Sequence, residues 1–335
     1  MTTVLEALNQ ALHTAMQADE RIYMLGEDLL DPYGGAFKVT RGLSSQFPDR
    51  VLTSPISEAG IVGAAGGMAL RGLRPVVEIM FGDFTTLIAD QLINSLTKFR
   101  WMYNDQVEVP LVVRTPMGGR RGYGPTHSQT LEKHFLGTPG LRVLAPCALG
   151  DPGKLLAQAI QEDHQPVLFI ENKLLYLKKV NDPAILDDFT LTEISTAGSY
   201  APSYRLPLHG APPPQLTIAC YGYMAGLALE AARRLAYEKE IFCELIVPTQ
   251  LAPFELDPVV ESAGRTGRLL AVEEGAAALG WGAEVIARTA EETGGSLKAC
   301  RRLAAADLPV PASMPMENEI LPDVNAIMQS AESMV

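Results

Sequence analysis

The feature that most constrains the fold is the alternation of short apolar runs with helical stretches. Such runs, which are typical of buried strands, lie in the first half at residues 21–25, 50–54, 74–80, 109–115, 141–146 and 166–172. Helical patterns lie between several of them, as at residues 83–102 and 150–163. This alternation predicts a mostly parallel α/β sheet with helices on both faces.

The pattern stops after about residue 178 and resumes near residue 212. The stretch between has little periodicity and ends in three consecutive prolines, which predicts a linker over residues 181–211. Further strands are expected at residues 215–224, 243–248, 268–275 and 297–305. A chain of 335 residues is long for one domain. We therefore expect two doubly wound α/β domains, over residues 1–180 and 212–335.

Composition excludes several classes of function. The net charge is −12 and no basic block offsets it, which argues against a nucleic-acid partner. No apolar run approaches the roughly 20 residues that a membrane-spanning helix requires. The first segment has an apolar helical face and a capping box of Thr3 with Glu6, but no arginine, so it is a poor transit peptide. Four scattered cysteines without a CxxC pair favour reduced thiols and a cytoplasmic protein.

Glu58 is the first candidate for chemistry. It is the one acidic residue in PISEAGIVGAAGGMALRG, residues 55–72, whose glycines and alanines leave little side-chain bulk on the helix they predict. Glycine costs up to about 1 kcal/mol in a helix interior, so such a run suggests close approach of another backbone or a ligand. A carboxylate at that contact suits a group that handles a proton. A glutamate in a first turn also simply favours the helix dipole.

His127 is the second candidate, in the glycine-rich segment GGRRGYGPTHSQT at residues 118–130. This segment follows a predicted strand, and ligands of open α/β sheets bind at the carboxyl ends of strands. A histidine in a solvated loop is the alternative. No GxxxxGK[ST] or GxGxxG phosphate-binding motif and no GxSxG elbow is present. The residues alone thus give an acid/base candidate and a histidine, without a phosphate site.

Nine fragments in a consistent order carry a resemblance to a known family. They include MLGED, VLTSPISEAGIVGAAGGMALRGLRPVVEIM, DFTTLIADQLINSLTK, THSQ, PVLFIEN, LLAVEEG and DLPVPASMPMENEILP. The chain resembles, nearly end to end, the β subunit of the E1 component of 2-oxo acid dehydrogenase complexes. These are thiamine-diphosphate enzymes of the transketolase-like group. The resemblance implies a pyrimidine-binding domain followed by a transketolase C-terminal-like domain.

The resemblance also implies roles for particular residues. Glu58 matches the glutamate that bonds N1′ of the cofactor's aminopyrimidine and promotes proton removal from C2 of the thiazolium. Phe84 and Ile56 match cofactor-binding positions, and Phe84 matches the aromatic that packs on the aminopyrimidine. His127 matches an active-site histidine near the reacting centre. The implied reaction is decarboxylation of a 2-oxo acid and transfer of the acyl group to a lipoyl acceptor.

Partners and metals follow from the same resemblance. In the family the α subunit holds the diphosphate and Mg²⁺ through a GDG…N motif, and this chain has no GDG. We therefore expect half of a shared site, an α2β2 heterotetramer and, for some members, a lipoyl-bearing E2 partner. Some β subunits also hold a structural K⁺ largely through backbone carbonyls. The matching positions here are Leu111, Ala159, Ile160 and Asp163.

Two alternatives stay open at this point. The chain could be the C-terminal half of a split transketolase or of a deoxyxylulose-phosphate-synthase-like enzyme, but the THSQ block and the closing DLPVPASMPMENEILP favour E1β. It could also be a non-catalytic scaffold subunit, against which intact Glu58, Phe84 and His127 argue. The sequence does not identify the 2-oxo acid.

Overall fold

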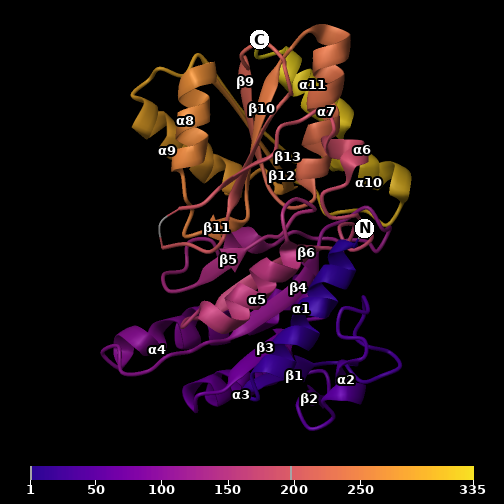
Figure 1. The fold of residues 1–335 in the computed structure, drawn as a ribbon, viewed down its shortest axis with the longest axis vertical. Coiled ribbons are helices and arrows are strands. Elements are labelled where there is room, and N and C mark those ends of the chain that lie inside the picture. The colour runs from indigo at the N-terminus through magenta and orange to yellow at the C-terminus, as the bar shows by residue number, and fades with distance from the viewer. Residues whose placement is uncertain (1, 197) are drawn as a thin grey trace.

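The computed structural model describes residues 2–196 and 198–335 and has two α/β halves, each built on its own sheet (Figure 1). Within these residues the first sheet has the order β11-β5-β6-β4-β3-β1-β2. Its strands are β1 (Ile22–Gly26), β2 (Val51–Thr53), β3 (Arg74–Glu78), β4 (Val112–Met117), β5 (Arg142–Leu144), β6 (Val167–Asn172) and β11 (Gln250–Ala252). Every pair is parallel except β11 with β5. The predicted parallel sheet is thus confirmed.

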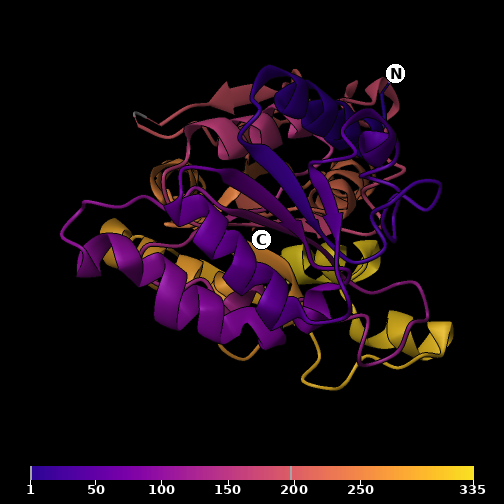
Figure 2. The same cartoon turned by 90° about the horizontal axis from the view of Figure 1, so that it is seen from below.

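Helices cover both faces of this sheet. They are α1 (Val4–Ala18), α2 (Leu43–Gln46), α3 (Glu58–Leu70), α4 (Thr97–Met102), α5 (Pro152–Glu162) and three 3₁₀ or π segments, η1 (Gly82–Ile88), η2 (Asp90–Leu96) and η3 (Glu132–His134). The short helix α6 (Pro183–Leu186) instead packs against the second half. Figure 2 shows indigo α1 on one side of the strands and the purple helices of residues 58–102 on the other. The expected capping box of Thr3 with Glu6 begins α1. The apolar face of α1 is buried against α5 and the sheet.

The helix expected over residues 83–102 is not continuous. It winds as the 3₁₀ segment η1, the π segment η2 and then α4. Gly82 packs closely against Met117. A Cβ at position 82 would come within 2.2 Å of the Met117 Cγ. At the other end, the Thr97 hydroxyl donates to the carbonyl of Leu92, five residues back. Single π turns of this kind often mark functional sites.

The second sheet has the order β13-β12-β9-β10-β8-β7 among the described residues. Its strands are β7 (Thr192–Ile194), β8 (Ser203–Pro207), β9 (Leu216–Cys220), β10 (Cys243–Pro248), β12 (Arg268–Ala276) and β13 (Ala299–Ala305). Its helices are α7 (Met224–Lys239), α8 (Asp257–Thr266), α9 (Trp281–Thr293), α10 (Met314–Ile320) and α11 (Val324–Glu332). Helices α7 and α11 pack on one face, and α8 and α9 on the other.

The structure differs from the expected linker over residues 181–211. Strands β7 and β8 lie within it and extend the second sheet, because β8 pairs antiparallel with β10 and β7 pairs antiparallel with β8. Strand β7 is a three-residue edge strand without a buried residue, and β8 has polar residues between its buried ones, so neither shows the apolar run that identifies a buried strand. We propose that the second domain begins near Thr192 and not at residue 212.

A continuous apolar core joins the two halves. It includes Ile170 from the first sheet together with Tyr221 and Trp281 from the second half. Strand β11, which follows β10 in the chain, crosses over to pair with β5 of the first sheet. The loop after β4 therefore lies against the second half at this junction. None of the helices in the described residues combines the length and the apolar character that crossing a bilayer requires.

Candidate active site

Glu58 begins α3 directly after β2 and a short loop, at the carboxyl edge of the first sheet. Only 7 % of this residue is exposed. Among residues 2–196 and 198–335, no group donates a hydrogen bond to its carboxylate, although the helix N-terminus favours a negative charge there. Unlike Oε1 of Glu27, the oxygens of this carboxylate keep some contact with solvent. The carboxylate is therefore available to a ligand.

A second acidic residue, Glu27, lies beside Glu58 and was not singled out from the sequence. It follows β1, and β1 pairs in parallel with β2, so the two strands deliver both carboxyl groups to one edge. Glu27 is 8 % exposed and its Oε1 has no hydrogen-bond partner among the described residues. Burial, and then the charge of Glu58, raise the pKa of Glu27 above its usual value. An acid directly after a parallel strand, in MLGED, was the available signal.

Phe84 and His127 come together although 43 positions separate them in the sequence. The His127 ring meets the Phe84 ring edge to face, with centroids 5.4 Å apart, and the Phe81 ring at 4.8 Å. His127 is half-buried, and its Nδ1 lies 3.0 Å from the hydroxyl of Thr126. Phe84 stands on η1, which packs against α3. The structure thus gathers Phe84, His127 and the Glu58 helix around one edge of the first sheet.

Two charged residues of the first half form hydrogen bonds with the segment that carries His127. Asp83 Oδ1 accepts hydrogen bonds from the backbone N–H of Gln129 at 3.2 Å and from its side-chain amide at 2.9 Å. Lys173, which is 1 % exposed, donates from Nζ to the carbonyl of His127. Sequence reasoning missed both residues. A charged residue at the end of a buried strand, as in PVLFIENK, was the only signal for Lys173.

Ile56, two residues before Glu58, projects into solvent with 83 % of its surface exposed. One face of α3 carries Gly60, Gly63, Ala64 and Gly67, all exposed. A Cβ added at Gly63 or Gly67 would meet nothing within 4 Å. Gly66, by contrast, lies inside the protein against Leu96. The glycine run is therefore divided between an internal contact and an open, nearly flat face.

Protein groups already bind carbonyls at positions that the resemblance suggests for potassium, which are Leu111, Ala159, Ile160 and Asp163. Nη1 of Arg74 donates to the carbonyl of Ile160 at 2.8 Å and to that of Asp163 at 3.0 Å. The carbonyl of Leu111 accepts from the N–H of Val167. These hydrogen bonds satisfy carbonyls at the C-terminal end of α5, where a cation is favoured. The guanidinium of Arg74 thus already donates to the carbonyls of two of the four positions.

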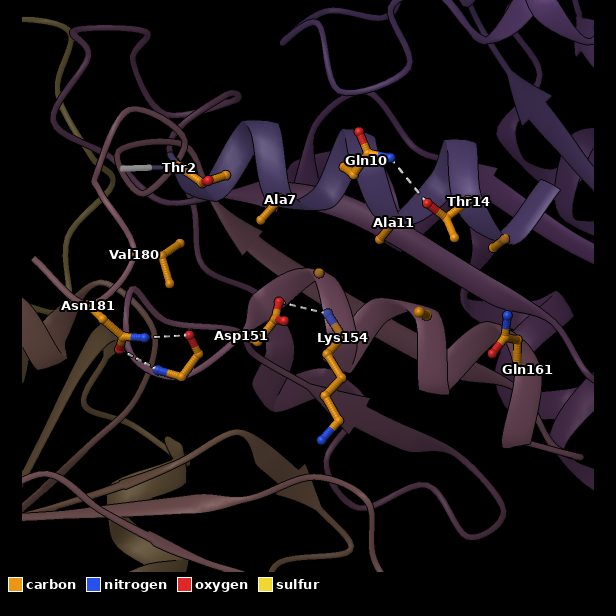
Figure 3. Close-up of a pocket in the computed structure, with 14 residues that line it drawn as sticks. Thr2, Ala7, Gln10, Ala11, Thr14, Asp151, Lys154, Gln161, Val180 and Asn181 are labelled. Carbon is orange, nitrogen blue, oxygen red and sulfur yellow. Dashed lines mark hydrogen bonds between the residues drawn. The ribbon is translucent and has the colours of Figure 1, made fainter. Parts of the chain in front are cut away.

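In the described part of the chain, no group of three or more histidine, cysteine, aspartate or glutamate side chains is arranged to hold a metal ion. The prominent groove of 610 Å³ between α1 and α5 contains none of the candidate residues (Figure 3). Some of its polar groups bond to one another: Gln10 donates to Thr14, and Asn181 exchanges two hydrogen bonds with Gly150. We assign no chemistry to this groove.

Comparison with protein families matches both halves of the chain. Residues 1–178 match the model described as "Transketolase, pyrimidine binding domain" and residues 210–327 match "Transketolase, C-terminal domain". A solved structure described as "Split gene transketolase, inactive beta4 tetramer" superposes with a TM-score of 0.75, covering 100 % of this chain and 98 % of that one. At 19 % identity this likeness shows the fold alone.

Individual relatives are similar over nearly their whole length. The mitochondrial pyruvate dehydrogenase E1 component subunit beta-1 of Arabidopsis thaliana is 37 % identical, over 98 % of this chain and 88 % of that protein. The β subunit of the acetoin:2,6-dichlorophenolindophenol oxidoreductase of Cupriavidus necator is 35 % identical, over 97 % and 95 %. The pyruvate dehydrogenase E1 subunit beta of Rickettsia felis is 33 % identical, over 98 % and 97 %.

Proposed function

Because this chain belongs to the family of E1 β subunits of the pyruvate and acetoin dehydrogenase type, we propose that Glu58 and His127 act in an active site shared with an E1 α subunit. The enzyme class is that of the E1 oxidoreductases. The proposed reaction is decarboxylation of a 2-oxo acid, with transfer of the acyl group to a lipoyl acceptor. Thiamine diphosphate, when bound, supplies the electron sink for loss of CO₂.

The observation that carries the proposal is the unpaired, nearly buried carboxylate of Glu58. Its place at the start of α3 fits a hydrogen bond to N1′ of an aminopyrimidine, through which Glu58 holds and returns a proton. Glu27, whose own Oε1 is unpaired, adds negative charge beside it.

Phe84 and Ile56 are proposed as the apolar contacts of the cofactor. Phe84 offers an aromatic face at the same sheet edge as Glu58, and Ile56 projects freely from the loop that precedes α3. Aromatic and aliphatic contacts orient a heterocyclic ring without fixing its proton, so they complement the carboxylate. His127, packed on Phe84, is proposed to act near the reacting carbon after CO₂ has left, and not in cofactor binding.

The α subunit is expected to cover the exposed face of α3. Gly60, Gly63 and Gly67, with only the methyl group of Ala64 between them, leave that face nearly flat, so another backbone can approach closely. The diphosphate and Mg²⁺ are assigned to the α subunit, and the proposed assembly is α2β2. A lipoyl-bearing E2 is proposed as the acceptor.

The deciding experiment is calorimetric titration with thiamine diphosphate and Mg²⁺, first on this chain alone and then on the chain co-expressed with its E1 α subunit. We expect binding in the pair only. Tight binding by the chain alone would refute the shared site. Binding by the pair without turnover of any 2-oxo acid would favour the scaffold alternative.

For His127→Ala we expect unchanged cofactor binding and impaired acyl transfer, so loss of binding in that variant would contradict the role given to His127.

The proposed location is the cytoplasm. Of the four cysteines, Cys147, Cys220 and Cys243 are buried as free thiols and Cys300 is exposed and free, as expected for a reducing compartment. The plant relatives are described as mitochondrial, whereas the other relatives named above are bacterial. Cell fractionation decides between these locations.

A further inference from the structure

Two carboxylates of the second half bind the loop that carries His127. Glu274, at the end of β12, accepts a hydrogen bond from the N–H of Gly119 at 2.7 Å. Glu317, on α10, accepts two, from the N–H of Arg120 at 2.6 Å and of Gly122 at 3.1 Å. Each oxygen of Glu317 thus serves one amide of the loop. Hydrogen bonds to a charged acceptor are stronger than those between neutral groups.

The setting of Glu317 indicates that these amides are its main partners. Its exposed fraction is 0 %, and no lysine, arginine or histidine of the described residues forms an ion pair with it. Its neighbour Glu319, on the same helix, faces solvent. A carboxylate buried this fully requires compensation, and here two backbone N–H groups from another domain supply it. The interaction therefore couples α10 to the loop specifically.

The loop itself is shaped to fit this contact. Arg120 has φ of 66°, a left-handed conformation that a residue with a side chain rarely adopts. Its guanidinium also donates to the carbonyl of Pro322, just beyond α10. A Cβ at Gly119 would lie 2.7 Å from Leu321 Cδ1 and 2.8 Å from Glu317 Oε1, so only glycine approaches this closely. The strained backbone is held in place by residues 317–322.

We propose that Glu317 is a positioning residue, through which the second domain sets the place of His127 over Phe84. On the other side of His127, Gln129 is tied to Asp83 of the first half. The segment between Gly122 and Gln129 is therefore fixed at both ends, each end by a different half of the molecule. This inference rests on the proposed function, since it concerns the same site.

Hydrogen exchange on the full-length chain tests the anchoring itself. In Glu317→Gln the side chain keeps its shape, but its amide nitrogen must face one of the two N–H groups. We expect exchange in residues 118–130 to become at least about tenfold faster, as loss of a charged hydrogen bond predicts. The matched control, Glu319→Gln, should leave exchange unchanged. Unchanged exchange in Glu317→Gln overturns the proposal.

Kinetics of the enzyme paired with its α subunit test the consequence for the site. We expect kcat for acyl transfer to fall roughly 10- to 100-fold in Glu317→Gln, as misplacement of a reacting group by about 1 Å predicts. KM for the 2-oxo acid and the affinity for thiamine diphosphate should not change. Faster loop exchange with normal kcat overturns the positioning role. A wild-type pair that fails to bind thiamine diphosphate refutes the proposed function instead, whatever the loop exchange.

If Glu317→Gln does not fold, Glu317→Asp takes its place. Aspartate keeps the negative charge but is one methylene shorter, so it no longer reaches the N–H groups of both Arg120 and Gly122. The same two measurements apply, with smaller changes in the same direction. Wild-type loop exchange and wild-type kcat in this variant overturn the anchoring of the loop by the second domain.

Discussion

Lys173 donates a hydrogen bond from its buried ammonium group to the backbone carbonyl of His127. The same Nζ lies 5.2 Å from the centre of the Phe81 ring and 5.7 Å from that of Tyr123. Burial lowers the pKa of Lys173 to about 8, although nearby carboxylates act in the opposite direction. The segment that carries His127 is therefore bonded to an ammonium group, that of Lys173, whose burial makes its charged form costly.

This cost predicts a pH-dependent stability for Lys173→Met. In the unfolded chain Lys173 has the ordinary pKa of 10.5, so between that value and about 8 the unfolded state binds more protons at this position. The free energy of unfolding therefore gains a contribution as pH rises through this window, up to roughly 3 kcal/mol. Methionine removes it. The free energy of unfolding in urea should be measured for wild type and for Lys173→Met near pH 7 and near pH 10. Relative to the variant, wild type should be more stable at pH 10 than at pH 7.

The matched control for this measurement is Lys154→Met, since Lys154 is exposed. Its effect should not depend on pH over the same window. A pH-independent difference between Lys173→Met and wild type would mean that the ammonium group is adequately solvated or paired. It would then carry no desolvation cost.

Glu58→Gln should abolish decarboxylation and leave the fold and the assembly intact. Glutamine keeps the size of the side chain but neither accepts nor returns a proton at N1′, and loss of such catalysis typically costs 10²- to 10⁴-fold in rate. Steady-state turnover with the α subunit, alongside size-exclusion chromatography, measures both effects. Glu20→Gln, at an exposed site, is the control. Near-normal turnover in Glu58→Gln would contradict the role assigned to this residue.

Gly63→Leu and Gly66→Leu place the same side chain at an exposed and at a buried position of α3. At Gly66 a Cβ alone would come within 2.3 Å of Leu96 Cδ2, so leucine should lower the free energy of unfolding of this chain by at least about 1–3 kcal/mol. At Gly63 nothing lies within 4 Å, so the chain should keep or slightly gain stability. Gly63→Leu should instead block pairing with the α subunit. Pairing of Gly63→Leu at wild-type affinity would remove this face from the interface.

These glycines show how far the sequence alone can predict the site. Their number indicated close packing, and the structure confirms a helix beginning at Glu58. Sequence could not tell which glycines pack internally, because Gly66 meets Leu96, which lies at the end of the π-helical segment η2. Periodicity assumes a regular helix, so it could not anticipate that winding.

Long-range polar contacts were the other part that sequence reasoning could not reach. Glu317 and Arg120 are 197 positions apart, and neither occurs in a motif with defined spacing. Strands β7 and β8 were missed because both are short and carry polar residues, so neither forms a continuous apolar run. The buried parallel strands, in contrast, were predictable from their apolar composition alone.

The hydrogen bonds of Arg74 predict that the melting temperature of the chain does not depend on potassium. Its guanidinium already donates to the carbonyls of Ile160 and Asp163. We therefore expect the same melting temperature in potassium chloride and in choline chloride at equal ionic strength. Binding of an ion to the folded state alone would raise the melting temperature with ion concentration. A concentration-dependent rise specific to potassium would show that an ion binds beside Arg74.

The burial of Glu273 predicts a pH dependence of the free energy of unfolding that is opposite to the one predicted for Lys173. Burial, and then the charge of Glu132, raise the pKa of Glu273 to about 7, from 4.5 in the unfolded chain. The folded state thus binds more protons between these values, so stability falls as pH rises through this window, by up to roughly 3 kcal/mol. Glu273→Gln mimics the protonated form and can still accept from the N–H of Gly282. The variant should gain stability over wild type between pH 5 and pH 8 in urea unfolding, whereas Glu291→Gln, at an exposed site, should not. An equal difference at both pH values would show that Glu273 is ionised in the folded protein throughout.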